Sequence, residues 1–129
     1  MEIKESEYSE NFIVTEESCI SEIDSSLPNL LGTYILVKWM EIVCAKNMNR
    51  NLDKKYITVG KEVSIDHVGM VKKDESVEII SKIITEEKKY TIFSIKALVN
   101  NKIVATASHK RIIVPKKILS KVLKENNNG

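Results

Sequence analysis

The sequence has few cysteines and little net charge, and each shortage excludes a class of protein. Its 129 residues include 2 cysteines, 2 prolines and 4 glycines, and only 5% are aromatic. Cys19 and Cys44 have neither the spacing of metal ligands nor a secretory context, so we expect reduced thiols in a cytoplasmic protein. The formal net charge is +2, with lysines and glutamates interspersed. The sequence therefore has no basic stripe of the kind that would predict a nucleic-acid partner.

The sequence also lacks the features of a secreted or membrane-spanning chain. Residues 1–10 are acidic and polar, which is unlike a signal peptide. The longest apolar run, residues 30–45, is shorter than about 18 residues and carries Lys38 and Glu41 near its middle. Each charge there would cost roughly 2.5–3.5 kcal/mol inside a bilayer. We therefore expect no membrane partner and, over residues 1–129, a single domain.

The apolar run itself, LLGTYILVKWMEIVCA, is the strongest helix candidate. The helix could begin as late as Thr33 and is expected to end near residues 47–51. A helix that is apolar on nearly every side is normally buried on nearly every side. We therefore expect Glu41 in, or at the edge of, a low-dielectric environment, where an ionised carboxylate needs a partner or a functional use.

Strand-like segments make up most of the remaining chain. They lie at residues 11–16, 57–68, 75–85, 90–99 and 103–114. Asn100-Asn101 predicts a tight hairpin turn, because asparagine tolerates positive φ. Pro115 is expected to end the last strand.

Two of these segments show informative faces. In residues 57–68, alternation interrupted only by Lys61 predicts one core-facing set: Ile57, Val59, Val63, Ile65 and His67. In residues 75–85 the alternation slips near Ile79–Ile80 and Ile83–Ile84, which indicates a bulge or burial on both faces.

The two ends of the chain are expected to lie outside the core of roughly residues 10–115. Residues 1–9 are polar and expected to be ragged. Residues 116–125 predict a short basic amphipathic helix, and residues 126–129, NNNG, are expected to be disordered. Residues 116–129 thus form a C-terminal extension.

The order of strand, long helix and four further strands predicts an α+β fold. An antiparallel sheet of about five strands wrapped around one long central helix buries the helix against its concave face. That arrangement is the hotdog fold. A single layer leaves a sheet edge and part of the helix exposed, so we expect a homodimer or a dimer of dimers.

Five short segments carry a resemblance to a known family. They are Gly32-Thr33, Met40-Glu41, Val59-Gly60, His67 and His109-Lys110-Arg111. Over roughly residues 10–115 their spacing resembles the fluoroacetyl-CoA thioesterase-like family of hotdog proteins. The resemblance implies a catalytic set of Thr33, Glu41 and His67. It also implies that Gly60, His67 and Arg111 lie near bound substrate.

The resemblance implies hydrolysis of a small or medium acyl-CoA thioester to free acid and CoA. Glu41 would activate water or attack directly, His67 would shuttle protons, and Thr33 would orient these groups. Backbone N–H groups around Gly32 would suit the oxyanion, and Arg111 would hold CoA phosphates. No metal or other cofactor is implied.

One segment departs from the family pattern. Aromatic lid residues are expected in the connector before the helix, where this chain has Asp24 and Leu27. We therefore expect thioester hydrolysis without a special preference for fluoroacetyl-CoA.

Structural interpretations of the same residues remain open. Thr33 is also a natural first residue of a helix, and Glu41 could pair with Lys38 or with a lysine on a strand. His67 could be a hydrogen-bonded core histidine, and Arg111 could make only an ion pair. His109, on one strand face with Arg111, could equally be a surface residue.

Two other functions also remain open. One is a hotdog module that binds and senses acyl-CoA without turning it over. The other is a hydratase or dehydratase, but the Asp–His pair typical of that class is not found around residues 30–45.

Overall fold

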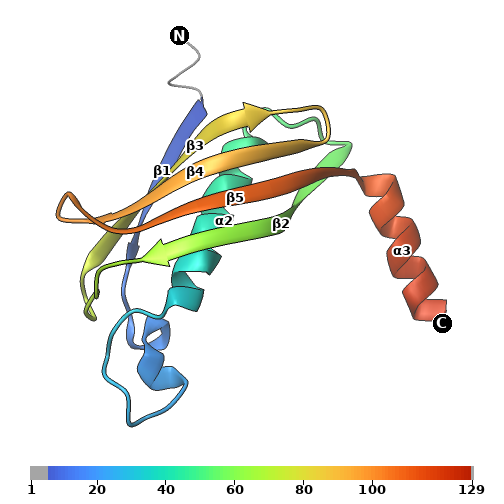
Figure 1. Cartoon of the computed structure of the whole chain (residues 1–129). Helices are drawn as coiled ribbons and strands as arrows, with labels where there is room; N and C mark the ends of the chain where they lie inside the picture. Colours follow the sequence, from blue (N-terminus) through green and yellow to red (C-terminus); the bar gives the residue numbers. More distant parts are fainter. Residues whose placement is uncertain (1–5, 129) are drawn as a thin grey trace.

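The computed structural model describes residues 6–128, and the side chains of residues 6–125. Within these residues, two helices and five strands follow one another in the order β1 Glu7–Ile13, α2 Thr33–Asn49, β2 Tyr56–His67, β3 Ser76–Glu86, β4 Tyr90–Val99, β5 Lys102–Pro115 and α3 Lys116–Asn128. Two 3-10 turns, η1 Glu16–Ser18 and η2 Ile20–Glu22, lie in the connector before α2. The strands form one antiparallel sheet in the order β1-β3-β4-β5-β2. The sheet lies across α2, as the sequence predicts (Figure 1).

Helix α2 is covered on one side by the sheet. Its buried residues are Leu36, Trp39, Met40, Val43, Cys44, Asn47 and Met48. Thr33 and Lys38 are exposed, and the Glu41 side chain is 44% exposed. The prediction of burial on nearly every side is therefore wrong for the single chain, because one sheet covers only one side of a helix.

Strand β2 changes face at a β-bulge. Its pairing with β5 shifts register between Gly60 and Glu62, which leaves Lys61 as the extra residue. Beyond the bulge, Val63, Ile65 and His67 are half-buried, as predicted.

Before the bulge the prediction for β2 is wrong, because one extra residue reverses the inward side. Val59 is 37% exposed. Thr58 instead contacts Arg111 of β5, and Gly60 faces Glu41 of α2 and His109 of β5.

Strands β3, β4 and β5 lie within one residue of their predicted ranges at each end. A register shift between Ile83 and Thr85 confirms a bulge at the second predicted slip, and the extra residue, Ile84, is 57% exposed. On β4 every second residue from Thr91 to Val99 is buried. Asn100 and Asn101 have φ values of 51° and 68°, which confirms the tight turn between β4 and β5.

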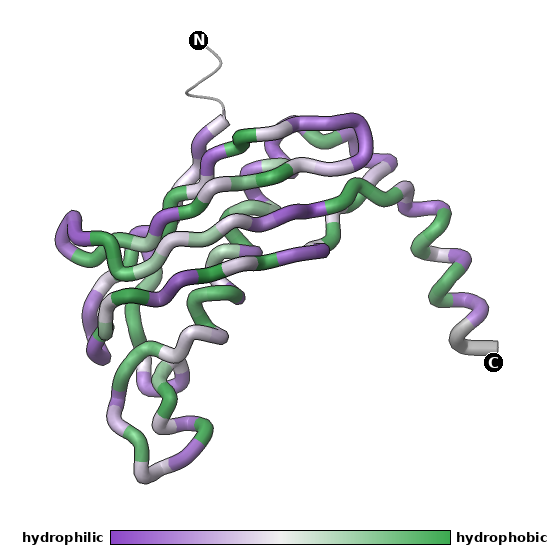
Figure 2. Tube along the Cα trace, viewed as in Figure 1, coloured by the Kyte–Doolittle hydropathy of each residue, from purple (hydrophilic) through white to green (hydrophobic). Residues whose placement is uncertain are grey.

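Both ends of the described chain are more regular than predicted. β1 begins at Glu7, inside the segment expected to be ragged, because residues 7–13 pair with β3 along their whole length. Helix α3 runs to Asn128, so the expected disorder of residues 126–129 is wrong for 126–128, while residue 129 lies outside the described residues. Figures 1 and 2 show α3 extending away from the sheet with alternating apolar and polar residues.

The core lies between α2 and the inward face of β3, β4 and β5, and includes both cysteines as free thiols. Burial raises the pKa of the Cys44 thiol to about 12. Among the described residues, neither helix combines the length and apolar character needed to cross a bilayer.

Candidate functional site

Polar side chains meet α2 at two levels along its axis. At the first turn, Thr33 contacts His67 at the end of β2. Two turns further on, Glu41 contacts Arg111 from β5. The antiparallel crossing of α2 and β2 explains this pairing, because the start of the helix meets the end of the strand.

The Thr33–His67 contact is a hydrogen bond of 2.8 Å between Oγ1 and Nδ1. The other ring nitrogen, Nε2, is buried and has no hydrogen-bond partner among the described residues. A buried polar atom without a partner is uncommon and often has a functional explanation. With Nδ1 held by Thr33, Nε2 is the ring atom of His67 whose hydrogen-bonding capacity is unused.

Gly32 precedes Thr33 as the N-cap of α2. A Cβ at this position would lie 2.5 Å from Cε1 of the Tyr34 ring, so the ring fills the space that a side chain would need. The first N–H groups of a helix have no acceptor within it. The Gly32 N–H donates to the Ser18 oxygen at 3.0 Å and the Ile35 N–H donates to the Gly32 oxygen at 3.1 Å, so the N–H groups of Thr33 and Tyr34 are the ones at this end that could meet an anion.

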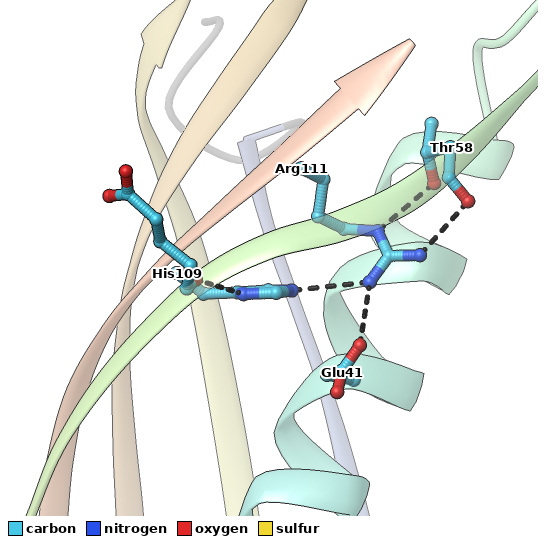
Figure 3. A network of polar contacts seen from close by, with 5 residues as sticks. Glu41, Thr58, His109 and Arg111 are labelled. Atoms are coloured by element: carbon cyan, nitrogen blue, oxygen red, sulfur yellow. Dashed lines mark hydrogen bonds and ion pairs between the residues drawn. The ribbon is translucent and has the colours of Figure 1, made fainter. Parts of the chain in front are cut away.

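Arg111 lies at the centre of the second group of polar residues (Figure 3). Its guanidinium donates to Thr58 through Nε to Oγ1 at 3.0 Å and through Nη2 to the backbone oxygen at 3.1 Å. Nη1 lies 3.4 Å from Oε1 of Glu41 and 3.2 Å from Nε2 of His109. The Arg111 side chain is 8% exposed and that of Glu41 is 44% exposed, so the arginine is the buried charge and Glu41 lies at the edge of the buried region, the second of the two predicted alternatives. Burial lowers the pKa of Arg111, and the Glu41 carboxylate opposes that shift.

Gly60 makes room for the Glu41 carboxylate. A Cβ on Gly60 would lie 2.6 Å from Glu41 Oε1 and 3.2 Å from His109 Cε1. A shallow hollow of about 140 Å³ opens here between α2, β2 and β5. Its lining residues are Glu41, Gly60, Lys61, Glu62, Val63 and His109.

His109 belongs to the site although sequence reasoning assigned it no role. It is 1% exposed, which excludes the surface interpretation. Its Nδ1 lies 2.8 Å from the backbone oxygen of Glu62. Burial lowers the pKa of His109, and the Arg111 guanidinium also lowers it, while the hydrogen bond to Glu62 and the Glu41 carboxylate oppose this. The position two residues before Arg111 on one strand face is the signal from which its place could have been inferred.

The chain brings together Thr33 with His67 and Glu41 with Arg111 and Gly60, but not all three predicted catalytic residues. Thr33 and Glu41 are eight residues apart on one helix, which corresponds to about 12 Å along its axis. No hydrogen bond joins Glu41 to Thr33 or His67 among the described residues. Within residues 6–128, no three His, Cys, Asp or Glu side chains gather as metal ligands.

Comparisons with known proteins give a family and a fold. The profile of FlK, the fluoroacetyl-CoA-specific thioesterase, matches residues 14–117. The structure of the fluoroacetyl-CoA thioesterase FlK is 16% identical and aligns with a TM-score of 0.82 over 92% of this chain and 93% of that one. No curated protein sequence matches.

Two further structures are similar. A thioesterase superfamily member from Thermus thermophilus is 17% identical, with a TM-score of 0.87 over 95% of this chain and 90% of that one. A hot-dog-like protein from Thermanaerovibrio acidaminovorans is also 17% identical, with a TM-score of 0.87 over 95% of this chain and 91% of that one. The predicted hotdog fold is thus confirmed.

Proposed function

Because the chain belongs to the fluoroacetyl-CoA-specific thioesterase family, and is therefore a thioesterase that hydrolyses acyl-CoA, we propose that Thr33, Glu41 and His67 are its catalytic residues. We propose a small or medium acyl group as the part released as the free acid. The observation that carries the site assignment is the 2.8 Å Thr33–His67 hydrogen bond together with the partnerless Nε2 of His67.

His67 and Thr33 act on the leaving group in this proposal. When the Thr33 hydroxyl donates to Nδ1, the neutral imidazole carries its proton on Nε2. That proton is then available to the CoA thiolate as the carbon–sulfur bond breaks. In the other tautomer Nε2 is a base that can take a proton from water. Either way, Thr33 holds the ring while Nε2 reacts.

Glu41 acts on the acyl carbon. Its carboxylate either attacks the carbonyl, forming an anhydride that water hydrolyses, or takes a proton from an attacking water. The support for this role is its half-exposed side chain beside a hollow, with Arg111 Nη1 3.4 Å from one oxygen. A carboxylate that serves only to neutralise a buried arginine would not need access from solvent.

Gly32, Gly60 and His67 lie against the substrate in this proposal, and Arg111 acts on it from a distance. N–H groups at the start of α2, beside Gly32, would stabilise the oxyanion. Gly60 leaves the hollow beside Glu41 open. The Arg111 guanidinium already donates to Thr58 and His109, so its action on substrate is electrostatic, exerted from beneath Glu41.

We also propose a homodimer, or a dimer of dimers, with each site near the subunit boundary. Two observations support this: β2 is an edge strand of the sheet, and α2 is covered on one side only. A second copy could also close the gap of about 12 Å between the two catalytic levels. Light scattering at micromolar concentration is the test, and a stable monomer would contradict the proposal.

The deciding experiment for the function is release of free CoA thiol across a panel of acyl-CoAs. We expect turnover of small or medium acyl groups. Because Asp24 and Leu27 stand where the family has aromatic lid residues, we expect fluoroacetyl-CoA and acetyl-CoA to react at similar rates. A protein that binds acyl-CoA in calorimetry yet releases no thiol would instead be a sensing module. Turnover of fluoroacetyl-CoA orders of magnitude faster than acetyl-CoA would contradict the lid argument.

A further inference from the structure

The inward face of β5 carries two buried polar residues in succession. His109 and Arg111 are two residues apart, and they are 1% and 6% exposed. Of the two, only Arg111 reaches the Glu41 carboxylate, and it does so through Nη1. The same Nη1 atom contacts His109, so the orientation of the arginine toward Glu41 depends on what the histidine presents to it.

The hydrogen-bond partners of His109 determine its tautomer. An arginine N–H can only donate, so the 3.2 Å contact with Arg111 Nη1 requires a lone pair on Nε2. A backbone carbonyl can only accept, so the 2.8 Å contact with the Glu62 oxygen requires a proton on Nδ1. Both bonds are satisfied only by the neutral imidazole with its proton on Nδ1.

We propose that His109 is a positioning residue whose neutral ring accepts from Arg111 Nη1 and thereby fixes the guanidinium in the orientation that meets Glu41. Thr58 holds the other side of the guanidinium, through Nε and Nη2. Removing the acceptor at His109 would therefore leave Nη1 free to turn away from Glu41. As far as catalysis is concerned, this role rests on the proposed function of Glu41.

The surroundings of His109 favour the neutral ring. The charged groups that face it are Arg111 on its own strand and Glu41 from α2, while β2 contributes the Glu62 carbonyl. From β4 it meets the uncharged Phe93 ring, with centroids 6.3 Å apart. Protonation at Nε2 would remove the acceptor and turn an N–H toward the guanidinium. Burial also lowers the pKa of His109, so the unfolded chain binds this proton more readily than the folded protein.

The first test compares His109→Phe with His109→Gln. Phenylalanine keeps an aromatic ring and removes the acceptor. Glutamine offers an uncharged oxygen that lies about as far from the backbone as Nε2 of histidine does. On the best acyl-CoA of the panel, we expect His109→Phe to lower kcat at least about tenfold with little change in KM. His109→Gln should recover most of that loss. Equal impairment of both variants, or parent kcat in His109→Phe, would overturn the proposal.

Phe93→Leu is the matched control for packing. It loosens the layer beside His109 and leaves the acceptor for Arg111 intact. We expect a lower melting temperature with kcat near that of the parent. A loss of kcat as large as in His109→Phe would mean that packing, not the acceptor, matters, and would refute the positioning role.

Two further readouts do not depend on turnover. The sequence has 2 histidines, so imidazole nitrogen signals can be assigned by comparison with His109→Gln. The proposal requires a protonated Nδ1 and an unprotonated Nε2 at pH 7, and the opposite tautomer or an imidazolium would overturn it. In the parent, the free energy of unfolding should fall as the pH drops below about 6.5, where His109 of the unfolded chain becomes protonated. The fall should continue until the pH reaches the pKa of His109 in the folded protein. His109→Gln should lack this part of the pH dependence. If the parent releases no CoA thiol from any acyl-CoA, the proposed function fails and these two readouts alone decide on His109.

Discussion

Replacing Gly60 with alanine should separate activity from stability. No described glycine has positive φ, so the backbone at Gly60 accepts an alanine. The new methyl group, however, would lie 2.6 Å from Glu41 Oε1. To restore ordinary van der Waals contact this oxygen, which is also the one that contacts Arg111, must move by about 0.8 Å.

The effect on folding should be small. Alanine in place of glycine restricts the unfolded chain, which stabilises the protein by about 0.4–1 kcal/mol. Against this, Glu41 must rotate and the buried His109 must give by a few tenths of an ångström, since its Cε1 lies 3.2 Å from the new Cβ. Glu41 is the end of a flexible, 44% exposed side chain, so its rotation is cheap. We expect the melting temperature to stay within about 3–5 °C of the parent, or about 1 kcal/mol.

The effect on catalysis should be much larger, because a misplacement of about 1 Å in a reacting group can cost roughly a hundredfold. We expect kcat/KM of Gly60→Ala, measured by release of CoA thiol, to fall about tenfold to a hundredfold. The same change in a Glu41→Gln background separates displacement of the carboxylate from a simple block of substrate. If Gly60→Ala acts through Glu41, it should add little to the loss already caused by Glu41→Gln.

Two results would refute this reasoning. Gly60→Ala with parent kcat/KM would mean that the position of Glu41 against Gly60 is unimportant for the reaction. An equal loss in the parent and Glu41→Gln backgrounds would mean that the methyl group obstructs substrate directly.

Three further predictions concern the same chain. Glu41→Gln should keep an acceptor for Arg111, and its free energy of unfolding should stay within about 1 kcal/mol of the parent's. Its kcat/KM should nevertheless fall at least about a hundredfold. Combining Glu41→Gln with His67→Ala should cost far less activity than the product of the two single losses. Thr33→Ala removes the 2.8 Å contact with His67 Nδ1 and should lower kcat/KM by a smaller factor than His67→Ala, measured in the same thiol-release assay. Cys19 and Cys44 are buried, and burial raises the pKa of both thiols, so neither should react with a disulfide reagent within minutes at pH 8 unless denaturant is added.

The fold could be predicted from the sequence because its signals are local. The apolar run predicted α2, and the strand-like segment at residues 90–99 predicted β4. Asn100-Asn101 predicted the turn that joins β4 to β5. Each of these depends on residues within a dozen positions of one another, and helix and strand periods report on that range.

The errors arose where pairing between distant segments decides the outcome. Lys61 was recognised as an interruption in β2, but only the register against β5 shows that it is an extra residue, which turns Thr58 and Gly60 inward and Val59 outward. The start of β1 was missed for a similar reason, since residues 7–10 are polar and are ordered by pairing with β3.

The same limit applied to the charges of the site. The sequence predicted that Glu41 needs a partner, but it could not choose between Lys38 nearby and a distant residue. In the structure Glu41 pairs with Arg111, seventy positions away. His109 was left without a role because its position on one face with Arg111 does not show whether that face is buried, and the structure shows that it is.

Arg111 is buried whereas Glu41 is partly exposed, and this difference fits a catalytic role for the Glu41 carboxylate better than a purely structural one. A buried arginine needs hydrogen bonds on all sides, and Thr58 and His109 provide three of them with neutral groups. The contact with Glu41, at 3.4 Å, is the longest of the four, so the arginine is anchored largely without it. Glu41 can therefore turn from Arg111 toward a reacting acyl group while the guanidinium keeps its three other hydrogen bonds, and its exposed side chain faces the hollow through which such a group would approach.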